Sequence, residues 1–179
     1  MASRGRAATK HGILVAAASV LAARQGASMA EVAAAAGIAR GTLYRHFPTR
    51  ESLLRALEGA ANEEAGRRLA EANLDGVPVD EALARVVRAL VAVGGDFIVL
   101  LRERRPPEPR FAGPLVALIE RGRANGEIRS DVPVATLVES LLALIGTCVR
   151  TGRVAGMGSE DISSMALGLF LAGARPTAD

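Results

Sequence analysis

Two short predicted helices joined by a very tight turn constrain the fold of this chain more than any other feature. Ser28, with Glu31 three residues later, forms a capping box that predicts a helix over about residues 29–36. Gly37 ends that helix, and another is predicted over about residues 40–46. Helices joined by so short a turn cannot lie antiparallel, so we expect them to cross steeply, as in a helix-turn-helix.

The segments on either side complete a small helical unit. Apolar residues at helical spacing predict a first helix over about residues 9–25. Pro48 cannot extend the third helix. Thr49 is a suitable N-cap for a fourth helix over about residues 50–73.

The rest of the chain is also predicted to be helical. After a break at residues 75–78, further helices are expected over about residues 79–104, 111–124, 133–151 and 159–171, the last of them capped by Ser159. No segment shows the alternation rich in β-branched residues that a strand requires. We therefore predict an all-α protein of about nine helices.

The third helix presents two chemically different faces. Leu43 and Phe47 fall on one side, where they can pack on the helices before them. Side chains suited to base edges in a DNA major groove fall on the other: Arg40, Gly41, Thr42 and Arg45. Arginine can pair bidentately with guanine, a threonine methyl can touch thymine, and Gly41 lets the backbone approach closely.

Other polar residues flank this helix where phosphates of a bound duplex would lie. Tyr44, His46 and Arg50 can each donate a hydrogen bond to phosphate, and Ser28 stands at a helix start. Taken singly, Tyr44 could equally be a half-buried core residue and His46 an exposed polar one. The arrangement as a whole favours the binding interpretation.

Charge is distributed unevenly along the chain. Residues 1–50 hold seven Lys/Arg and one acidic residue, for a net charge of +6, whereas residues 51–179 have a net charge of −3. A basic segment on an acidic body is typical of a module that binds a polyanion. The alternative is a basic end that is merely solvated.

Residues 9–57 resemble the N-terminal DNA-binding domain of the TetR family of transcriptional repressors. The matching string is "SMAEVAAAAGIARGTLYRHFPTRESLL", and "IERGRANGEIRSDVP" resembles a turn common in the family's C-terminal domains. The resemblance implies a helix-turn-helix domain over 1–50, a connecting helix over about 50–73, and a regulatory and dimerisation domain over 74–179. It implies a homodimeric repressor that leaves its palindromic double-stranded operator when a small molecule binds.

The sequence departs from the family pattern just before the third helix. Ala39 occupies the position where the family usually has a capping residue such as Ser or Thr. Losing such a cap typically costs about 0.5–2 kcal/mol. We hypothesise that Arg40 compensates by contacting phosphate or base.

Two apolar faces in the C-terminal part are candidates for the dimer contact, because a two-fold DNA site needs paired binding modules. The candidate residues lie on the two last predicted helices: Leu137, Leu141, Leu144, Ile145, Met165 and Leu169. The alternative is that these faces only pack within one subunit.

A pocket in the middle helices would be largely aliphatic and suit a hydrophobic effector. The candidate lining is Val93, Asp96, Phe97, Leu101, Leu118, Leu142 and Cys148, each of which could also be plain core. We expect no metal and no cofactor, since one cysteine excludes a thiolate zinc cluster.

Catalysis has little support in the sequence. Both histidines lie in the basic N-terminal part, and no phosphate loop, HExxH or paired-carboxylate motif is present. A helical-bundle enzyme is therefore a distant alternative, and a ligand-independent DNA-binding or adaptor protein a nearer one.

Basic residues before the apolar stretch 13–23 raise the possibility of a signal peptide. His11 and Gly12 interrupt the approach to that stretch, and no continuous apolar run reaches about 18 residues, so we expect a cytoplasmic protein without a membrane span.

Overall fold

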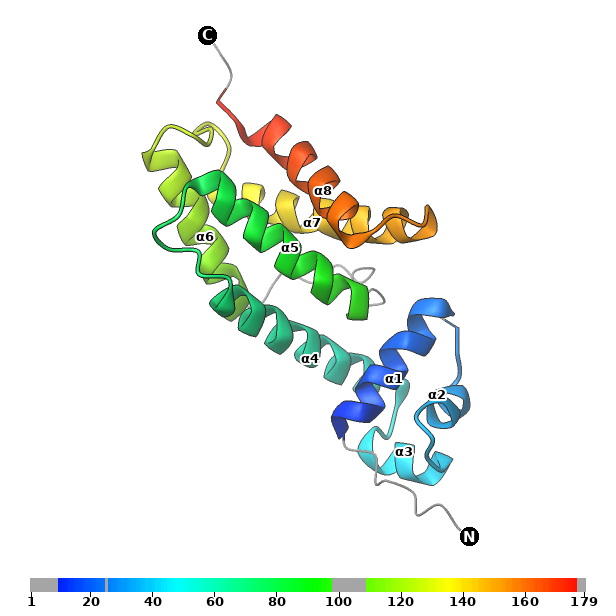
Figure 1. Ribbon diagram of the computed structural model, residues 1–179. Coiled ribbons are helices and arrows are strands. Elements are labelled where there is room, and N and C mark those ends of the chain that lie inside the picture. Colours follow the sequence, from blue (N-terminus) through cyan, green and yellow to red (C-terminus); the bar gives the residue numbers. More distant parts are fainter. Residues whose placement is uncertain (1–9, 25, 98–108, 177–179) are drawn as a thin grey trace. The chain divides into compact units, whose positions relative to one another are not determined.

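The computed structural model describes residues 10–24, 26–97 and 109–176, and every regular element in these ranges is an α-helix (Figure 1). The all-α prediction is confirmed. Eight helices lie within the described residues, against about nine expected. They are α1 (Lys10–Ala23), α2 (Met29–Ala35), α3 (Arg40–His46), α4 (Arg50–Glu71), α5 (Val79–Phe97), α6 (Pro109–Ala124), α7 (Val134–Val154) and α8 (Ser159–Ala174).

Backbone contacts divide the chain into two compact units. The first runs to Ala61 and includes α1, α2, α3 and the first half of α4, and Asp96 also belongs to it. The second begins at Asn62 and contains the end of α4 and α6, α7 and α8, with nearly all of α5. Because the boundary between Ala61 and Asn62 falls within α4, this helix is a covalent link between the two units. The domain boundaries at 50 and 74 remain predictions.

The first unit packs around apolar residues that the helical periodicity singled out. Ile13 and Leu21 of α1, Val32 of α2, Leu43 of α3 and Leu53 of α4 are all completely buried. α2 packs on both α1 and α3. These contacts fix α3 to the unit through one side only.

In the second unit, α7 packs on both α6 and α8 (Figure 1). Gly152 of α7 permits a close approach, because a Cβ there would lie 2.6 Å from Cγ1 of Ile162 in α8. Two contacts tie the end of α8 to other parts of the unit. The backbone N–H of Arg129 donates to the carbonyl of Ala174 at 2.9 Å, and Arg175 forms an ion pair with Asp80 at 2.6 Å.

α7 is long and apolar enough, by length and composition alone, to cross a membrane. An 18-residue window in it has a mean hydropathy of 1.5, although no continuous apolar run of that length stood out in the sequence. Its packing on α6 and α8 is that of a core helix, a kind of helix that passes the same test.

Two predicted boundaries are wrong in an instructive way. The helix expected to begin at about residue 111 begins earlier, with Pro109 as the first residue of α6. Proline is tolerated there because the first turn of a helix needs no N–H donor. Ser159, expected to cap the last helix, is its first residue, and Gly158 at the N-cap provides no side-chain hydrogen bond. The predicted helix over 79–104 is described only as far as Phe97.

Candidate nucleic-acid interface and effector pocket

The start of α2 has the capping box that the sequence predicts. The backbone N–H of Glu31 donates to Oγ of Ser28 at 3.3 Å, and the N–H of Ser28 donates to Oε2 of Glu31 at 2.7 Å. The Ser28 hydroxyl also donates to that carboxylate at 2.9 Å, and Arg24 forms an ion pair with it. A phosphate approaching Ser28 would therefore meet a carboxylate already held there.

One face of α3 is anchored and the other is open. Leu43 and Phe47 are buried, as predicted, with exposed fractions of 0% and 2%. Ala39 is the N-cap and offers no side-chain hydrogen bond. A Cβ at Gly41 would meet no atom within 4 Å, so nothing in the described protein around it requires glycine at that position.

Side chains on the open face of α3 are ordered by contacts with each other. Nη2 of Arg45 donates to Oγ1 of Thr42 at 3.2 Å. The guanidinium of Arg40 lies 5.6 Å from the centre of the Tyr44 ring, within cation–π range. These contacts hold two arginines over the surface of the helix before any partner arrives.

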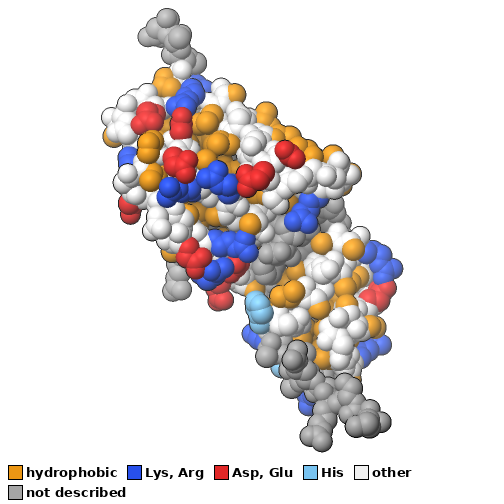
Figure 2. Space-filling view, viewed as in Figure 1, with side chains coloured by type: hydrophobic (Ala, Val, Ile, Leu, Met, Phe, Trp, Pro, Cys, Tyr) orange, Lys and Arg blue, Asp and Glu red, His pale blue; other side chains and the backbone are white. Residues whose placement is uncertain are grey.

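The open face of α3 is positively charged. Arg40, Arg45 and His46 are exposed, and the helix contains no acidic residue. By contrast, acidic and basic side chains lie next to each other over the second unit in Figure 2. An anionic partner is therefore attracted to α3 without having to displace an acid on the same helix.

Arg50 occupies the first position of α4 but is not simply directed at solvent. One guanidinium nitrogen, Nη1, donates to the buried carbonyl of Ala27, which lies 23 residues earlier, just before the α2 N-cap. Sequence reasoning assigned Arg50 to phosphate and missed this contact, because no local pattern reveals a partner so distant in sequence. Thr49 caps α4 as predicted, accepting from the N–H of Ser52 at 3.0 Å.

The structure describes the side chains of four of the seven predicted effector-binding residues. Val93 and Cys148 are buried, Leu142 is half-buried, and burial raises the pKa of the Cys148 thiol. Leu101 lies outside the described residues, as do the side chains of Asp96 and Phe97. Of the four that are described, only Leu118 lines the pocket described next.

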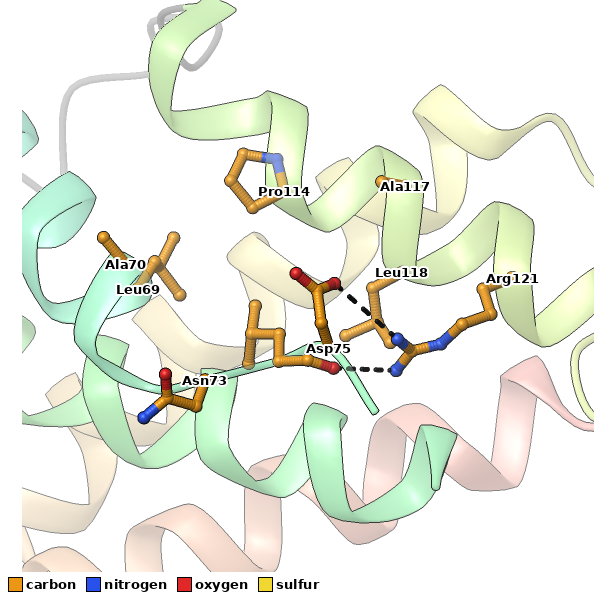
Figure 3. A pocket seen from close by; sticks show the side chains of 9 residues that line it. Leu69, Ala70, Asn73, Asp75, Pro114, Ala117, Leu118 and Arg121 are labelled. Atoms are coloured by element: carbon orange, nitrogen blue, oxygen red, sulfur yellow. Dashed lines mark hydrogen bonds and ion pairs between the residues drawn. The ribbon is translucent and has the colours of Figure 1, made fainter. Parts of the chain in front are cut away.

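A pocket of about 460 Å³ lies between the end of α4 and α6 (Figure 3). Its apolar lining is Leu69, Ala70, Leu74, Pro114, Ala117 and Leu118, and its polar lining is Asn73, Asp75 and Arg121. No group of three or more potential metal ligands occurs among the residues that the structure describes. The pocket thus combines an apolar part with one acid and one base.

The predicted dimer residues divide into two sets. Leu137, Leu141 and Ile145 are at most 5% exposed and form part of the core of their own subunit. Leu144 and Met165 are half-buried, and Leu169 is 54% exposed. Only the second set is available to another chain.

Comparisons with known proteins agree with this geometry. Residues 13–57 match the profile of bacterial regulatory proteins of the tetR family. The HTH-type transcriptional repressor LfrR of Mycolicibacterium smegmatis is 39% identical over 92 residues, which span 51% of this chain and 49% of LfrR. The HTH-type transcriptional regulator NfxB of Pseudomonas aeruginosa is 27% identical over 164 residues, 84% of this chain and 86% of NfxB.

Solved structures resemble the chain over almost its whole length. The crystal structure of LfrR from Mycobacterium smegmatis in complex with proflavine has a TM-score of 0.72 at 27% identity and covers 94% of this chain and 98% of that one. Residues 13–57 carry the N-terminal domain of the tetR family, and the described chain has the fold of TetR-like regulators. α2 and α3 lie within the matched residues.

Sequence reasoning also missed the hydrogen bonds that arginines make to the turn between α4 and α5. Nη1 of Arg85 donates to the carbonyls of Ala72 and Asn73, at 3.1 and 2.9 Å. Nη2 of Arg121 donates to the carbonyls of Leu74 and Val77, at 3.0 and 3.2 Å. Two arginines thus hold four carbonyls where α4 gives way to α5, and one of them also lines the pocket.

Proposed function

We propose that this chain is a homodimeric transcriptional regulator that binds a palindromic operator and releases it when a small molecule binds the second unit. The observation that carries the proposal is α3, whose buried Leu43 and Phe47 leave Arg40, Thr42 and Arg45 on an open face without acids. Such a helix fits a major groove, where arginine and threonine read base edges.

Phosphate contacts would fix the position of α3 in the groove. Tyr44, which is 37% exposed, and the exposed His46 end the helix and can donate to phosphate oxygens. Arg40 is another candidate, whereas Ser28, whose N–H and hydroxyl both donate to Glu31, is a weaker one than its position suggested. Because Arg50 already bonds the carbonyl of Ala27, we assign it a smaller share of phosphate binding than its position suggested.

Dimerisation would use the exposed remainder of α7 and α8. Leu144, Met165 and Leu169 form the apolar part of that surface, whereas the buried Leu137, Leu141 and Ile145 support it from within. A dimer places two recognition helices at successive major grooves, about one helical turn of DNA apart. As a DNA-binding regulator without catalysis, the protein acts in the cytoplasm.

The proposed response to an effector follows the precedent of LfrR, a structure of which holds proflavine. Effector binding in the second unit would shift α4 and change the separation of the two recognition helices. The effector must favour the non-binding arrangement, because a ligand that binds both arrangements equally shifts nothing.

A gel shift on the DNA upstream of the chain's own gene tests the proposal. We expect binding to weaken steeply with salt, as phosphate neutralisation requires. Arg45→Ala should weaken it, whereas Arg88→Ala, an exposed arginine on α5, should not. If the two variants lose binding equally, or if the wild type prefers no DNA sequence, the proposal is wrong.

A further inference from the structure

The pocket between α4 and α6 has an apolar floor and a charged end. Leu69 of α4 and Leu118 of α6 are 2% and 3% exposed and form the floor. Figure 3 shows Arg121 on the side of the pocket opposite Leu69, with the Asp75 carboxylate turned towards its guanidinium. A volume of about 460 Å³ lies in the range of small-molecule sites. The shape and lining suit an amphipathic molecule with one polar group.

Arg121 is the firmly held charge of this pocket. Its Nη2 is fixed by the carbonyls of Leu74 and Val77, and its side chain is only 31% exposed. Its Nη1 lies 4.0 Å from Oδ1 of Asp75, which is too far for a hydrogen bond. The guanidinium is therefore anchored through Nη2, whereas among the described residues Nη1 has only a long contact with a carboxylate.

Asp75 is, in contrast, the loosely held charge. Its side chain is fully exposed, so it can turn into solvent with little change in its environment. A carboxylate from a ligand could take its place near Nη1 and gain the shorter, charge-assisted hydrogen bond that Asp75 does not make. A cation would instead have to settle beside a guanidinium that cannot move away.

We propose that this pocket binds an amphipathic anion, with its carboxylate on Nη1 of Arg121 and its apolar chain over Leu69 and Leu118. The inference rests on the proposed function, because it names the effector class of the regulator. It also replaces the purely hydrophobic effector that the composition of the middle helices suggested.

The position of the pocket gives the anion a route to the DNA-binding unit. Leu69 and Ala70 belong to the last turns of α4, and the same helix begins at Arg50, which bonds the segment before α2. Arg121, which would bind the anion, also donates hydrogen bonds to two carbonyls of the turn after α4. A ligand that prefers one arrangement of this turn would change operator affinity by the same factor as operator DNA changes ligand affinity.

Calorimetry on the full chain with three probes built on an unbranched eight-carbon chain tests the charge class. The probes are octanoate, octanol and octyltrimethylammonium, whose head groups are anionic, neutral and cationic. We expect octanoate to bind most tightly. Arg121→Gln should weaken octanoate by about tenfold or more, the usual size of a charged hydrogen bond, whereas Arg88→Gln on α5 should leave it unchanged.

Asp75→Asn provides a test that does not disturb the turn. Removing the competing carboxylate should tighten octanoate binding by about two- to fivefold, in line with an exposed ion pair. If Arg121→Gln folds poorly, Arg121→Lys takes its place in the experiment. Because it keeps the positive charge, it should retain part of the affinity for octanoate. The inference is wrong if octanoate binds the Arg121→Gln variant as tightly as it binds wild type. It is also wrong if octyltrimethylammonium binds wild type more tightly than octanoate does and Asp75→Asn abolishes that binding.

The operator assay separates this inference from the function on which it rests. If ligand-free protein binds its operator but octanoate does not bind the protein, the anion site is wrong and the regulator stands. If octanoate binds through Arg121 while no operator is recognised, the regulator is wrong and the site stands.

Discussion

Arginines on α3 and on the second half of α4 have opposite surroundings. On α4, Arg67 bonds Glu64 and Glu71 at 2.6 Å each, and Arg68 bonds Glu64 at 2.6 Å. On α3, Arg40 and Arg45 contact a tyrosine ring and a threonine hydroxyl, and the helix has no acid. The charge of α4 is therefore neutralised within the helix, whereas the charge of α3 is left for a partner.

The largest expected effect concerns the anchor that lets α3 turn its charges outward. Leu43→Ala removes the buried contact of a seven-residue helix and should lower the free energy of unfolding by about 2–5 kcal/mol. Thermal unfolding followed by circular dichroism measures it. The half-buried Leu54 of α4 is the control, and Leu54→Ala should cost clearly less. Equal losses would mean that α3 is not held by this side chain.

The second prediction tests the comparison directly on DNA. Arg45→Ala on α3 should weaken operator binding by about 1–3 kcal/mol if the side chain reads a base. Arg67→Ala on α4 should leave it unchanged, because that charge is already matched by Glu64 and Glu71. Gel shifts at several salt concentrations measure both. An effect of Arg67→Ala as large as that of Arg45→Ala would remove the distinction between the two helices.

Arg50 lies at the start of α4 and could be either an arginine paired within the protein or one that contacts DNA. Arg50→Ala should destabilise the protein by about 1–3 kcal/mol, because it leaves the buried carbonyl of Ala27 without this donor. We expect the slope of operator affinity against salt to stay the same. A slope reduced by about 1 would assign Arg50 to phosphate instead. Arg55→Ala, which removes an exposed arginine paired with Glu51 on α4, is the matched control.

The smallest expected effect concerns Glu64, the carboxylate that Arg67 and Arg68 share on α4. Hydrogen bonds from Arg67 and then Arg68 lower the pKa of Glu64 from 4.5 to about 2. Because the folded pKa is the lower one, this stabilisation is present above about pH 4.5 and is lost as the pH falls towards 2. Solvent screening limits it to less than about 1 kcal/mol.

Denaturant unfolding of wild type and Glu64→Gln at pH 6 and pH 3 measures this effect. The difference in stability between the two proteins should shrink at the lower pH. A constant difference would mean that the pairing does not depend on the charge of Glu64.

Local chemistry is what made parts of the fold predictable. The bounds of α3, the capping box at Ser28 and the burial of Leu43 and Phe47 follow from caps, a proline stop and helical spacing over a few residues. The sequence also revealed the missing cap at Ala39, since a cap is a property of one position.

Contacts between distant segments were not predictable in this way. Arg121 bonds the carbonyl of Leu74, 47 residues away, and no pattern within either helix announces it. The pocket was therefore missed apart from Leu118. Similarly, periodicity identified an apolar face of α7 but could not decide between a second chain and its own subunit. The burial of Leu137, Leu141 and Ile145 decides that they pack within the subunit.

Gly41 has a consequence for how operator preference could change. A Cβ there would meet no protein atom within 4 Å, and the Gly41 backbone is not in the left-handed region, so the described fold does not require glycine at this position. Replacing glycine inside a helix with alanine even favours the helix, by about 1 kcal/mol. If position 41 is glycine for a reason, that reason lies in the DNA that the helix approaches and not in the packing of the protein, so an alanine there would change operator binding without destabilising the fold.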